Sequence, residues 1–349
     1  MEQVLLAPQE IRDAFANKAG KRDRELAESL GLTEGQLVAA FTGHGVTRLT
    51  SNLDDLFGQL NGLGEVMALT RNPACVIEKV GQYDNYHPGA HAAMVLTEEI
   101  DLRMFPSHWV HAFAVERKIE TGVRRSIQVF DAAGDAVHKV FLRDASDLDH
   151  WNHLIQMLAS DDQSQTIATT SRKPTEAPKA NIERVETLRS EWAKMTDTHQ
   201  FMRLTSKLKM NRLGAYRIAG EPLARLLQPE VVPGLFEQVR DQRLEVMVFV
   251  GNRGCIEIHG GPVQVLKQMG PWFNVLDSRF NLHLRTDQIA EVWAVTKPTQ
   301  RGPAVSVEAF DAEGGLIFQV FGRRAGEVDH RPAWDAIVAG LASAENEVA

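Results

Sequence analysis

One histidine in the middle of the chain combines a metal-binding side chain with the start of a helix. His199 follows Thr-Asp-Thr, three residues of types that favour the N-cap of a helix. Phe201, Leu204 and Leu208 come next at helical spacing, which predicts that this face of the helix packs inward. An imidazole at that position could reach a ligand lying beside the buried face. Residue type and spacing alone favour the simpler interpretation, a surface histidine on a capped helix.

Basic and aromatic residues on predicted strands are the other candidates for chemistry. Arg103 and Phe105 alternate along one strand of the first half, and their counterparts in the second half are His283 and Arg285. These positions are therefore not simply apolar core. Lys297 lies in Val-Thr-Lys-Pro at 295–298, also in a predicted strand region. Each cation taken alone is typical of a solvated sheet edge.

The last predicted strand of the second half carries several such residues together. Because strand side chains alternate with a period of two, Gln319, Phe321 and Arg323 share one face. Arg324 points to the other face unless a bulge intervenes. A flat anionic ligand with an apolar body would require aromatic walls, several cations and one axial donor, and the chain contains residues of all these types.

The elements that must position these residues are a helical N-terminal region and a run of short strands. The region from Glu10 to Phe41 is predicted to be helical, with Gly31 as a C-cap and a capping box formed by Thr33 and Gln36. The remaining predicted elements of the first half are strands at Val66–Leu69, Cys75–Lys79, Ala93–Leu96, Leu102–Phe105, Ala112–Arg117, Ser126–Phe130 and Lys139–Leu142, a glycine-containing hairpin turn at 131–134 and a closing helix at Leu148–Leu158.

The second half of the chain repeats this pattern. Cys75 matches Cys255 and Gly134 matches Gly314, each exactly one repeat later (255 − 75 = 180 and 314 − 134 = 180). The same offset aligns Glu-Val-Met at 65–67, Phe-Asp-Ala at 130–132 and Val-Phe at 140–141 with their copies. Chance does not keep such a register over so many strand positions, so the chain is a tandem duplication.

The repeat predicts both an architecture and a way to find a site. We expect an α+β fold in which each half is a large antiparallel sheet with flanking helices, and a ligand cleft between the halves. The predicted division is an N-terminal repeat at 1–160, a polar linker at 161–181 and a C-terminal repeat at 182–349. Residues shared by both halves serve the framework, whereas residues present in one half are candidates for a site. In the helical regions, where Phe-Ala at 15–16 aligns with Trp-Ala at 192–193 (192 − 15 = 177), His199 falls opposite Arg22, so the histidine is not shared.

The composition limits the classes of protein and partner. The 349 residues are 44% hydrophobic and 24% charged, which is typical of a soluble protein with two ordinary domains. A net charge of −8 argues against a broad nucleic-acid surface. Two cysteines provide neither a disulfide framework nor a zinc pattern. No signal peptide is evident, and no run approaches the about 20 apolar residues of a membrane span, so we expect a cytoplasmic protein without membrane insertion.

Taken together, these features resemble the HemS/ChuS family of cytoplasmic haem-binding proteins, also called haemin-degrading or haemin-transport factors. The resemblance extends from about Glu10 to about Leu341 in length and order. Its most specific parts are the Thr-Asp-Thr-His-Gln-Phe string and the Phe-Gln-Val-Phe-Gly-Arg-Arg string at 318–324. Leu-Arg-Met-Phe at 102–105, followed by His-Trp, and Val-Thr-Lys-Pro-Thr at 295–299 also match.

The resemblance implies that the ligand is haem, iron protoporphyrin IX, and it assigns roles to individual residues. His199 corresponds to the axial ligand of the iron, and Arg103 to the arginine on the distal face, where it would assist catalysis. Phe321 stands where many relatives are expected to have a tyrosine, so one hydroxyl donor is missing. The implied holders of the propionates and pocket rim are Lys297, Gln319 and Arg324, the implied aromatic walls are Phe105, Phe249 and Phe321, and further histidines available near these strands are His108, His111 and His283.

The implied function is haem uptake for iron acquisition, in one of two forms. The protein is either an enzyme that opens the haem macrocycle with an external electron donor, or a carrier that delivers haem to a separate oxygenase. In either form, the resemblance implies a membrane importer as a source of haem. Both use His199, so the sequence does not distinguish between them. A DNA-binding regulator built on the helices at 25–41 is a third reading, disfavoured because its second helix offers no Arg or Lys at its start. A steeply salt-dependent DNA affinity would support it.

Overall fold

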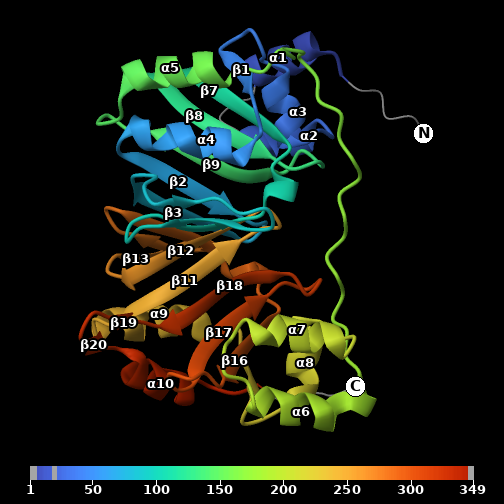
Figure 1. Ribbon diagram of the computed structural model, residues 1–349, viewed down its shortest axis with the longest axis vertical. Coiled ribbons are helices and arrows are strands. Elements are labelled where there is room, and N and C mark those ends of the chain that lie inside the picture. Colours follow the sequence, from blue (N-terminus) through green and yellow to red (C-terminus); the bar gives the residue numbers. More distant parts are fainter. Residues whose placement is uncertain (1–5, 18–21, 345–349) are drawn as a thin grey trace. The chain divides into compact units, whose positions relative to one another are not determined.

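The computed structural model describes residues 6–17 and 22–344 and divides into two compact units (Figure 1). The parts of the sequence predictions that fall on 1–5, 18–21 and 345–349 lie outside the described residues. The first unit comprises Met1–Arg71, Glu78–Arg172 and Gly251–Glu257, and the second comprises Asn72–Ile77, Lys173–Val250 and Ile258–Ala349.

The main division, between residues 172 and 173, falls inside the predicted linker. Each unit also contains a short segment from the other half of the sequence, which the predicted boundaries did not include. The reason is that two strands, β3 (Cys75–Gly81) and β12 (Cys255–Pro262), each begin in one unit and end in the other. A boundary drawn along the sequence cannot capture such an exchange.

The first unit contains the N-terminal helices, most of the first run of strands and a closing helix. The predicted closing helix is confirmed at its predicted bounds, as α5. The elements of this unit, apart from β3, are α1 (Pro8–Ala16), α2 (Asp23–Ser29), α3 (Glu34–Ala39), β1 (Val46–Leu49), α4 (Leu53–Leu60), η1 (Asn61–Leu63), β2 (Val66–Arg71), β4 (Tyr86–His87), β5 (Ala93–Leu96), β6 (Asp101–Met104), η2 (Pro106–His108), β7 (His111–Ile119), β8 (Gly122–Phe130), β9 (Ala136–Leu142) and α5 (Leu148–Leu158).

The second unit repeats this order with additional short elements. Its elements, apart from β12, are η3 (Ile182–Arg184), α6 (Val185–Ala193), α7 (Gln200–Lys207), α8 (Arg212–Ala219), β10 (Ala224–Leu227), α9 (Val231–Asp241), β11 (Glu245–Gly251), β13 (Leu266–Met269), β14 (Trp272–Leu276), β15 (Phe280–Arg285), η4 (Thr286–Gln288), β16 (Glu291–Lys297), β17 (Ala304–Phe310), β18 (Leu316–Gly322), β19 (Arg324–Ala325), β20 (Val328–Asp329) and α10 (Arg331–Ala339).

The strand registers confirm the tandem repeat. In the first unit, β7 and β8 pair antiparallel with Phe113 opposite Gln128, and in the second unit β16 and β17 pair with Trp293 opposite Glu308. Both units have a register irregularity at the same place, immediately before Phe130 and before Phe310. The two large sheets have the strand orders β1-β7-β8-β9-β2-β3-β15-β14-β13 and β10-β16-β17-β18-β11-β12-β6-β5-β4. The predicted α+β class is therefore confirmed.

The predicted turn and cap chemistry is present. Thr33 and Gln36 form a reciprocal capping box at α3, and Gly31 and Gly134 have φ values of +69° and +81°. The helices that resemble a DNA-binding motif pack together through Leu26 and other apolar residues in a small core.

In the second unit, helices cover the two faces of the sheet differently. Val246, Val248 and Val320 face a core shared with α9 and α10. The opposite face carries Trp293 and Val295, which belong to a core shared with α6, α7 and α8. These three helices pack at the β16 side of that face, and the positions that follow along β18 and β11 are half-buried. The candidate site lies in this region.

Candidate functional site

His199 occupies the position immediately before α7, with its side chain turned to solvent. The predicted helix start is confirmed, although the helix begins at Gln200 and His199 itself is the N-cap residue. Phe201 is 1% exposed and its ring lies 4.5 Å from Trp192 and 5.4 Å from Tyr216, which anchors the first turn. The His199 side chain is 93% exposed.

Asp197 fixes the orientation and the tautomer of this imidazole. Its Oδ1 accepts from the backbone N–H of His199 and lies 2.7 Å from Nδ1. The N–H bonds from His199 lower the pKa of Asp197, so this carboxylate is ionised and acts as an acceptor. Nδ1 must therefore carry the proton, and the lone pair of His199 resides on Nε2. A carboxylate on one ring nitrogen and a free lone pair on the other is the arrangement of a metal-ligating histidine.

An aromatic surface lies on the sheet of the same unit. Phe249 on β11 is opposite Gln319 on β18, and Met247 is opposite Phe321, so all four share one face. The rings of Phe249 and Phe321 are 5.4 Å apart and nearly perpendicular. These side chains are half-buried, whereas Val248, between them on β11, is fully buried on the other face.

A buried charge network continues this face toward the helices. Glu308 on β17 is opposite Gln319, and its carboxylate accepts from Lys297 Nζ (2.8 Å), Arg212 Nη1 (2.8 Å) and the Tyr216 hydroxyl (2.9 Å). Burial alone would raise the pKa of Glu308, but the charges of Lys297 and Arg212 hold it well below its ordinary value. Two cations therefore share one carboxylate, which leaves a net positive charge beside the aromatic surface.

The two cations of this network differ in accessibility. Lys297 is 3% exposed, and its Nζ also donates to Tyr216. Arg212 has a side chain that is 23% exposed, with Nη2 lying 3.7 Å from Met202 Sδ on α7. Lys297, which the resemblance assigned to the propionates, is thus engaged by Glu308, and Arg212 is the cation of this pair that reaches solvent. The expected role of Lys297 finds no support in this geometry.

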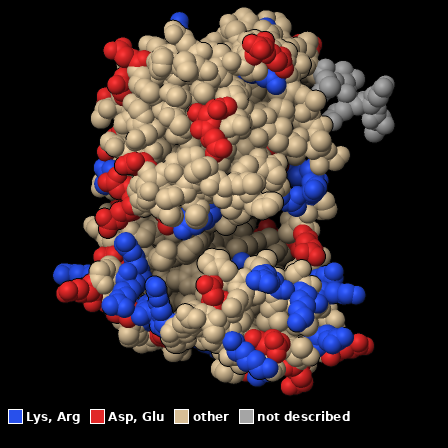
Figure 2. Space-filling view, in the orientation of Figure 1, with Lys and Arg blue, Asp and Glu red and all other residues tan. Residues whose placement is uncertain are grey.

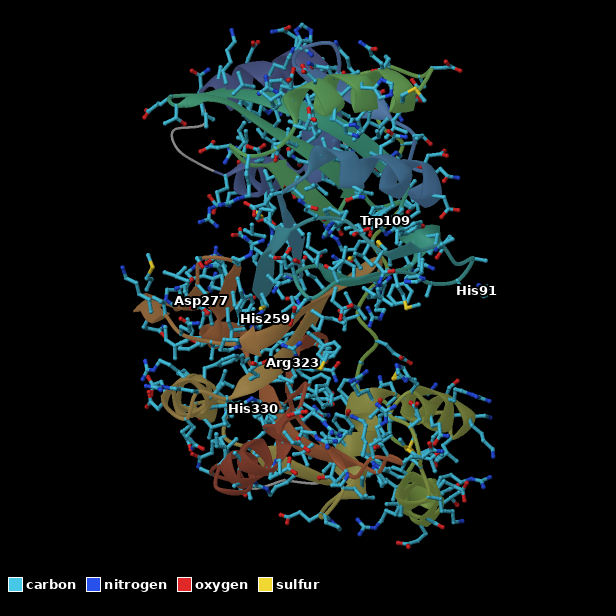
Figure 3. The ribbon with its side chains drawn as sticks, turned by 60° about the vertical axis from the view of Figure 1, so that its left-hand side comes forward. His91, Trp109, His259, Asp277, Arg323 and His330 are labelled. Atoms are coloured by element: carbon cyan, nitrogen blue, oxygen red, sulfur yellow. The ribbon has the colours of Figure 1, made fainter. Side chains whose placement is uncertain are left out.

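The two arginines after β18 lie in different local environments. β18 ends at Gly322, and Arg324 begins the short strand β19, where it is exposed and opposite Asp329. Arg323, labelled in Figure 3, donates to Glu245 Oε2 at 2.8 Å. Arg323 still pairs with β11, because its backbone N–H donates to Glu245 O at 3.1 Å, and the chain pairs with β20 only from Arg324 onward.

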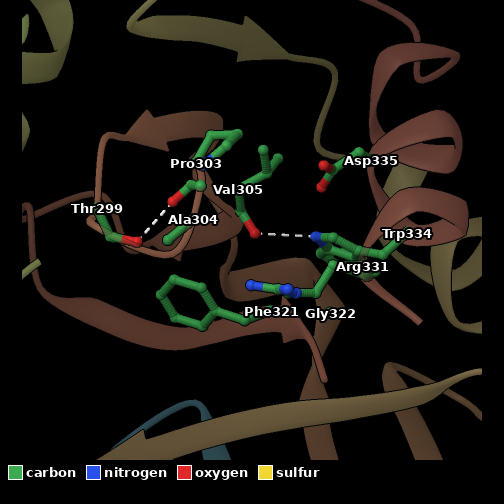
Figure 4. A pocket seen from close by; sticks show the side chains of 10 residues that line it. Thr299, Pro303, Ala304, Val305, Phe321, Gly322, Arg331, Trp334 and Asp335 are labelled. Carbon is green, nitrogen blue, oxygen red and sulfur yellow. Dashed lines mark hydrogen bonds between the residues drawn. The ribbon is translucent and has the colours of Figure 1, made fainter. Parts of the chain in front are cut away.

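A small hollow lies next to Phe321 (Figure 4). Its volume is about 70 Å³, well below the roughly 300–1,000 Å³ of a ligand pocket, and Trp334 and Asp335 of α10 form one wall. Arg331 also lines it, but its guanidinium is held by Asp329 at 2.6 Å. The hollow borders Phe321, and its one lining cation, Arg331, is already paired.

Two of the predicted site residues, Arg103 and Phe105, lie in the first unit. Arg103 is on β6 with its side chain 33% exposed, and it pairs with Asp101 on the same strand. Phe105 follows β6 and is half-buried, with its backbone N–H donating to Gly254 O at 2.9 Å. His199, Phe249, Lys297, Gln319, Phe321 and Arg324 all belong to the second unit.

The three further histidines have other environments. His111 is half-buried, and burial lowers its pKa. His283 lies 2.7 Å from Asn274 Oδ1 through Nδ1. His108 is in η2 and half-buried. No group of three or more His, Cys, Asp or Glu side chains suited to hold a metal ion occurs among the described residues.

Sequence reasoning missed Arg212, Tyr216 and Glu308. The repeat contained a signal for two of them, because the charges differ at equivalent positions. Gln128 stands where the second half has Glu308, and Glu34, the first residue of α3, stands where α8 begins with Arg212. A comparison of charge between the halves, and not of histidine alone, would have found the network.

Comparisons with known proteins identify the relatives of this chain. The family model described as the haemin-degrading HemS.ChuX domain matches residues 31–158 and 209–341. The hemin transport protein HmuS of Yersinia pestis is 36% identical over 335 residues, covering 95% of this chain and 96% of that protein. The hemin transport protein HemS of Yersinia enterocolitica is 35% identical, covering 94% and 95%.

Comparison with solved structures leads to the same kind of relatives. Holo-PhuS, a heme-binding protein from Pseudomonas aeruginosa, superposes with a TM-score of 0.92 at 40% identity, covering 97% of this chain and all of that one. ChuS, described as an E. coli heme oxygenase, superposes with a TM-score of 0.84 at 31% identity, covering 93% and 97%. Among the described residues, no helix is both long and apolar enough to cross a membrane. From its repeat, its fold and these matches, the chain belongs to the family of haemin-degrading HemS.ChuX domain proteins.

Proposed function

We propose that this protein binds haem on the half-buried sheet face of the second unit, with His199 as iron ligand, and opens the macrocycle to release iron. The observation that carries the proposal is the state of His199. Its Nδ1 is held by Asp197 at 2.7 Å, and its Nε2 is presented to solvent at the start of α7. That helix packs on the same sheet face that presents Phe249 and Phe321.

The residues around this face fit a flat, dianionic, largely apolar ligand. Phe249 and Phe321 supply ring contacts for the porphyrin. Arg212 and the exposed Arg324 supply charge for the propionates, and Gln319 a neutral hydrogen bond. Lys297 acts as the counter-charge that keeps Glu308 ionised and Arg212 in place, rather than as a direct ligand.

Each side chain has a defined task in this proposal. When bound, haem supplies the redox-active iron and the ring that is opened. His199 holds the iron, and Asp197 keeps the Nδ1 proton in place. The two phenylalanines exclude water from one side of the ring. Arg103 remains a prediction from the resemblance, as a hydrogen-bond donor on the distal side.

A carrier function is the second candidate, and the exposure of His199 favours it. An axial ligand whose side chain is 93% exposed can be displaced by a ligand from an acceptor protein without unfolding of the pocket. The carrier would take haem from a membrane importer and deliver it to a separate oxygenase, whereas the enzyme would need an external electron donor. We propose a cytoplasmic location for both.

Absorption spectra test haem binding. We expect haemin to give a sharp Soret band that saturates at one equivalent, and His199→Ala to lose or shift this band. His91→Ala removes another exposed imidazole and should behave like the parent. An unchanged spectrum and affinity in His199→Ala would refute the assignment of the ligand. The absence of a saturable band in the parent would refute haem binding.

Turnover distinguishes enzyme from carrier. Haem-loaded protein is supplied with an electron donor, with and without catalase. Ring opening that persists with catalase and falls at least tenfold in Arg103→Ala supports the enzyme. Ring opening abolished by catalase indicates attack by free peroxide, and then the carrier function stands.

A further inference from the structure

A polar cluster of residues that have no assigned role in haem binding is buried in the core of the first unit. His138 on β9 is 2% exposed and lies 2.8 Å from Thr70 Oγ1 through Nδ1 and 2.5 Å from the Tyr83 hydroxyl through Nε2. Thr70 donates to Cys255 Sγ at 3.6 Å, and Glu257 Oε2 lies 4.0 Å from His138 Nδ1. Burial lowers the pKa of His138 to about 3, so the imidazole is neutral.

The hydrogen bonds of this cluster run in one direction. Burial raises the pKa of Tyr83, so its hydroxyl remains protonated and donates to His138 Nε2. Nδ1 then carries the ring proton and donates to Thr70, whose own proton goes to Cys255. Among the described residues, no hydrogen bond from this cluster reaches a carboxyl oxygen of Glu257.

Glu257 is left without a hydrogen-bond partner within the described part of the chain, for either of its carboxyl oxygens, although it is fully buried. Such a carboxyl is stable in its neutral form and strongly disfavoured as an anion. Burial raises its pKa to about 8, against the opposing effects of Thr70 and Lys79. The titratable or charged groups that face it are His138 on β9, Glu78 and Lys79 on β3, Tyr83 after β3, and Cys255 on its own strand.

The fold does not require these polar residues, because the second unit does without them. At the repeat offset of 180, Ile77 stands in place of Glu257 and Phe318 in place of His138. Likewise Val250 replaces Thr70 and Val263 replaces Tyr83. All four replacements lie in the apolar core of the second unit. The polar cluster is therefore confined to one half. Because burial of these polar groups costs stability and the fold does not require them, we expect the cluster to have a role of its own.

The backbone next to the cluster holds the segment that follows Arg103. Gly254, three residues before Glu257 on the same stretch, accepts from the Phe105 backbone N–H and from Trp109 Nε1, both at 2.9 Å. Trp109, labelled in Figure 3, also lies beside His138, with ring centroids 6.0 Å apart. Any displacement of 254–257 must therefore move the segment Phe105–Trp109.

We infer that Glu257 is a positioning residue whose protonation holds the Phe105–Trp109 segment in place through Gly254. The neutral carboxyl is tolerated in the dry core, whereas the anion requires water or displacement of the strand. Ionisation thus loosens Gly254 and the segment next to Arg103. The consequence for haem chemistry rests on the proposed function, but the positioning itself does not.

Nuclear magnetic resonance of the ligand-free, ¹⁵N-labelled full chain tests the inference. We expect the Trp109 indole N–H signal, identified by its loss in Trp109→Phe, to shift between pH 6 and 9.5 with a midpoint near 8. Trp334, whose indole donates to Val305 O at 2.9 Å in the second unit, should not shift and serves as internal control.

Variants complete the test. In Glu257→Gln the Trp109 signal should stay constant over this pH range, and Glu257→Ile, which copies Ile77, should do the same if the amide prevents folding. Glu34→Gln removes another buried carboxyl of this unit and should leave the titration intact. A parent signal that does not titrate, or one that titrates equally in Glu257→Gln or Glu257→Ile, would overturn the inference. Haem titration of the same samples is independent, so failure to bind haem refutes the proposed function alone.

Discussion

Replacement of Glu257 offers a quantitative test of stability. The carboxyl must be neutral in the core, where its pKa is about 8, whereas the unfolded chain ionises it with a pKa of 4.5. Folding at pH 7 therefore requires uptake of a proton. The cost is about 3.4 kcal/mol, at about 1.36 kcal/mol for each pH unit between 4.5 and 7.

The sign follows from the raised pKa. The contribution of Glu257 to stability is least unfavourable below pH 4.5, becomes more unfavourable as the pH rises toward 8, and changes no further above 8. Glu257→Ile lacks the ionisable group and fills the position as Ile77 does in the second unit. The free energy of unfolding of Glu257→Ile should exceed that of the parent by about 1.4 kcal/mol at pH 5.5 and by about 4.8 kcal/mol at pH 8.

Urea denaturation of both proteins at several pH values measures this difference. The Tm of a unit of 150–250 residues changes by about 2–4 °C for each kcal/mol of stability. In thermal unfolding at pH 7, Glu257→Ile should therefore have a Tm about 7–14 °C above that of the parent. Glu257→Gln places an unpaired amide in the core, which lowers its stability at every pH. The change of its stability with pH should nevertheless match that of Glu257→Ile. Parallel curves for parent and Glu257→Ile between pH 5.5 and 8 would refute the reasoning.

Three further predictions concern other buried or half-buried groups. Although burial opposes it, Lys139 and Arg71 lower the pKa of Glu34 to about 2, so this group stabilises the fold above pH 4.5 and the effect fades as the pH falls toward 2. Glu34→Gln should cost about 3 kcal/mol at pH 7 and much less at pH 3 in urea denaturation; an equal loss at both would contradict the ion-pair explanation. Glu308→Gln leaves Lys297 and Arg212 without their buried partner and should cost about 3–5 kcal/mol, whereas Asp241→Asn, which breaks an exposed pair, should cost less than about 1 kcal/mol. Comparable losses in these two variants would show that the buried network is not special. Phe321→Ala should weaken haem binding about 10- to 100-fold, from about 1.5–3 kcal/mol of lost apolar contact, with Phe321→Leu retaining most of the affinity in a Soret titration. An unchanged Kd in Phe321→Ala would exclude this ring from the site.

The sequence was sufficient for the repeat, the element types and the start of the helix at His199. These depend on local chemistry that the sequence displays directly. Thr33 and Gln36 form their capping box, Gly134 has the positive φ of its hairpin turn, and the closing helix has its predicted bounds. The constant offset of 180 residues could be found from the sequence alone, because duplicated strands must keep their spacing to pair in the same register.

Tertiary structure decided which charges face each other and which segments share a core. Lys297 was assigned to a ligand from its place in a motif, but Glu308, one strand away, holds it in the core at 2.8 Å. Segments 72–77 and 251–257 change units because strand pairing is a long-range property that no local pattern encodes. In the sequence, nothing distinguishes Glu257 from other residues of predicted strands. Its environment is assembled from residues on three strands and a connecting loop, where Tyr83, His138 and Thr70 bond to one another and to Cys255 and leave both carboxyl oxygens of Glu257 without a hydrogen bond among the described residues.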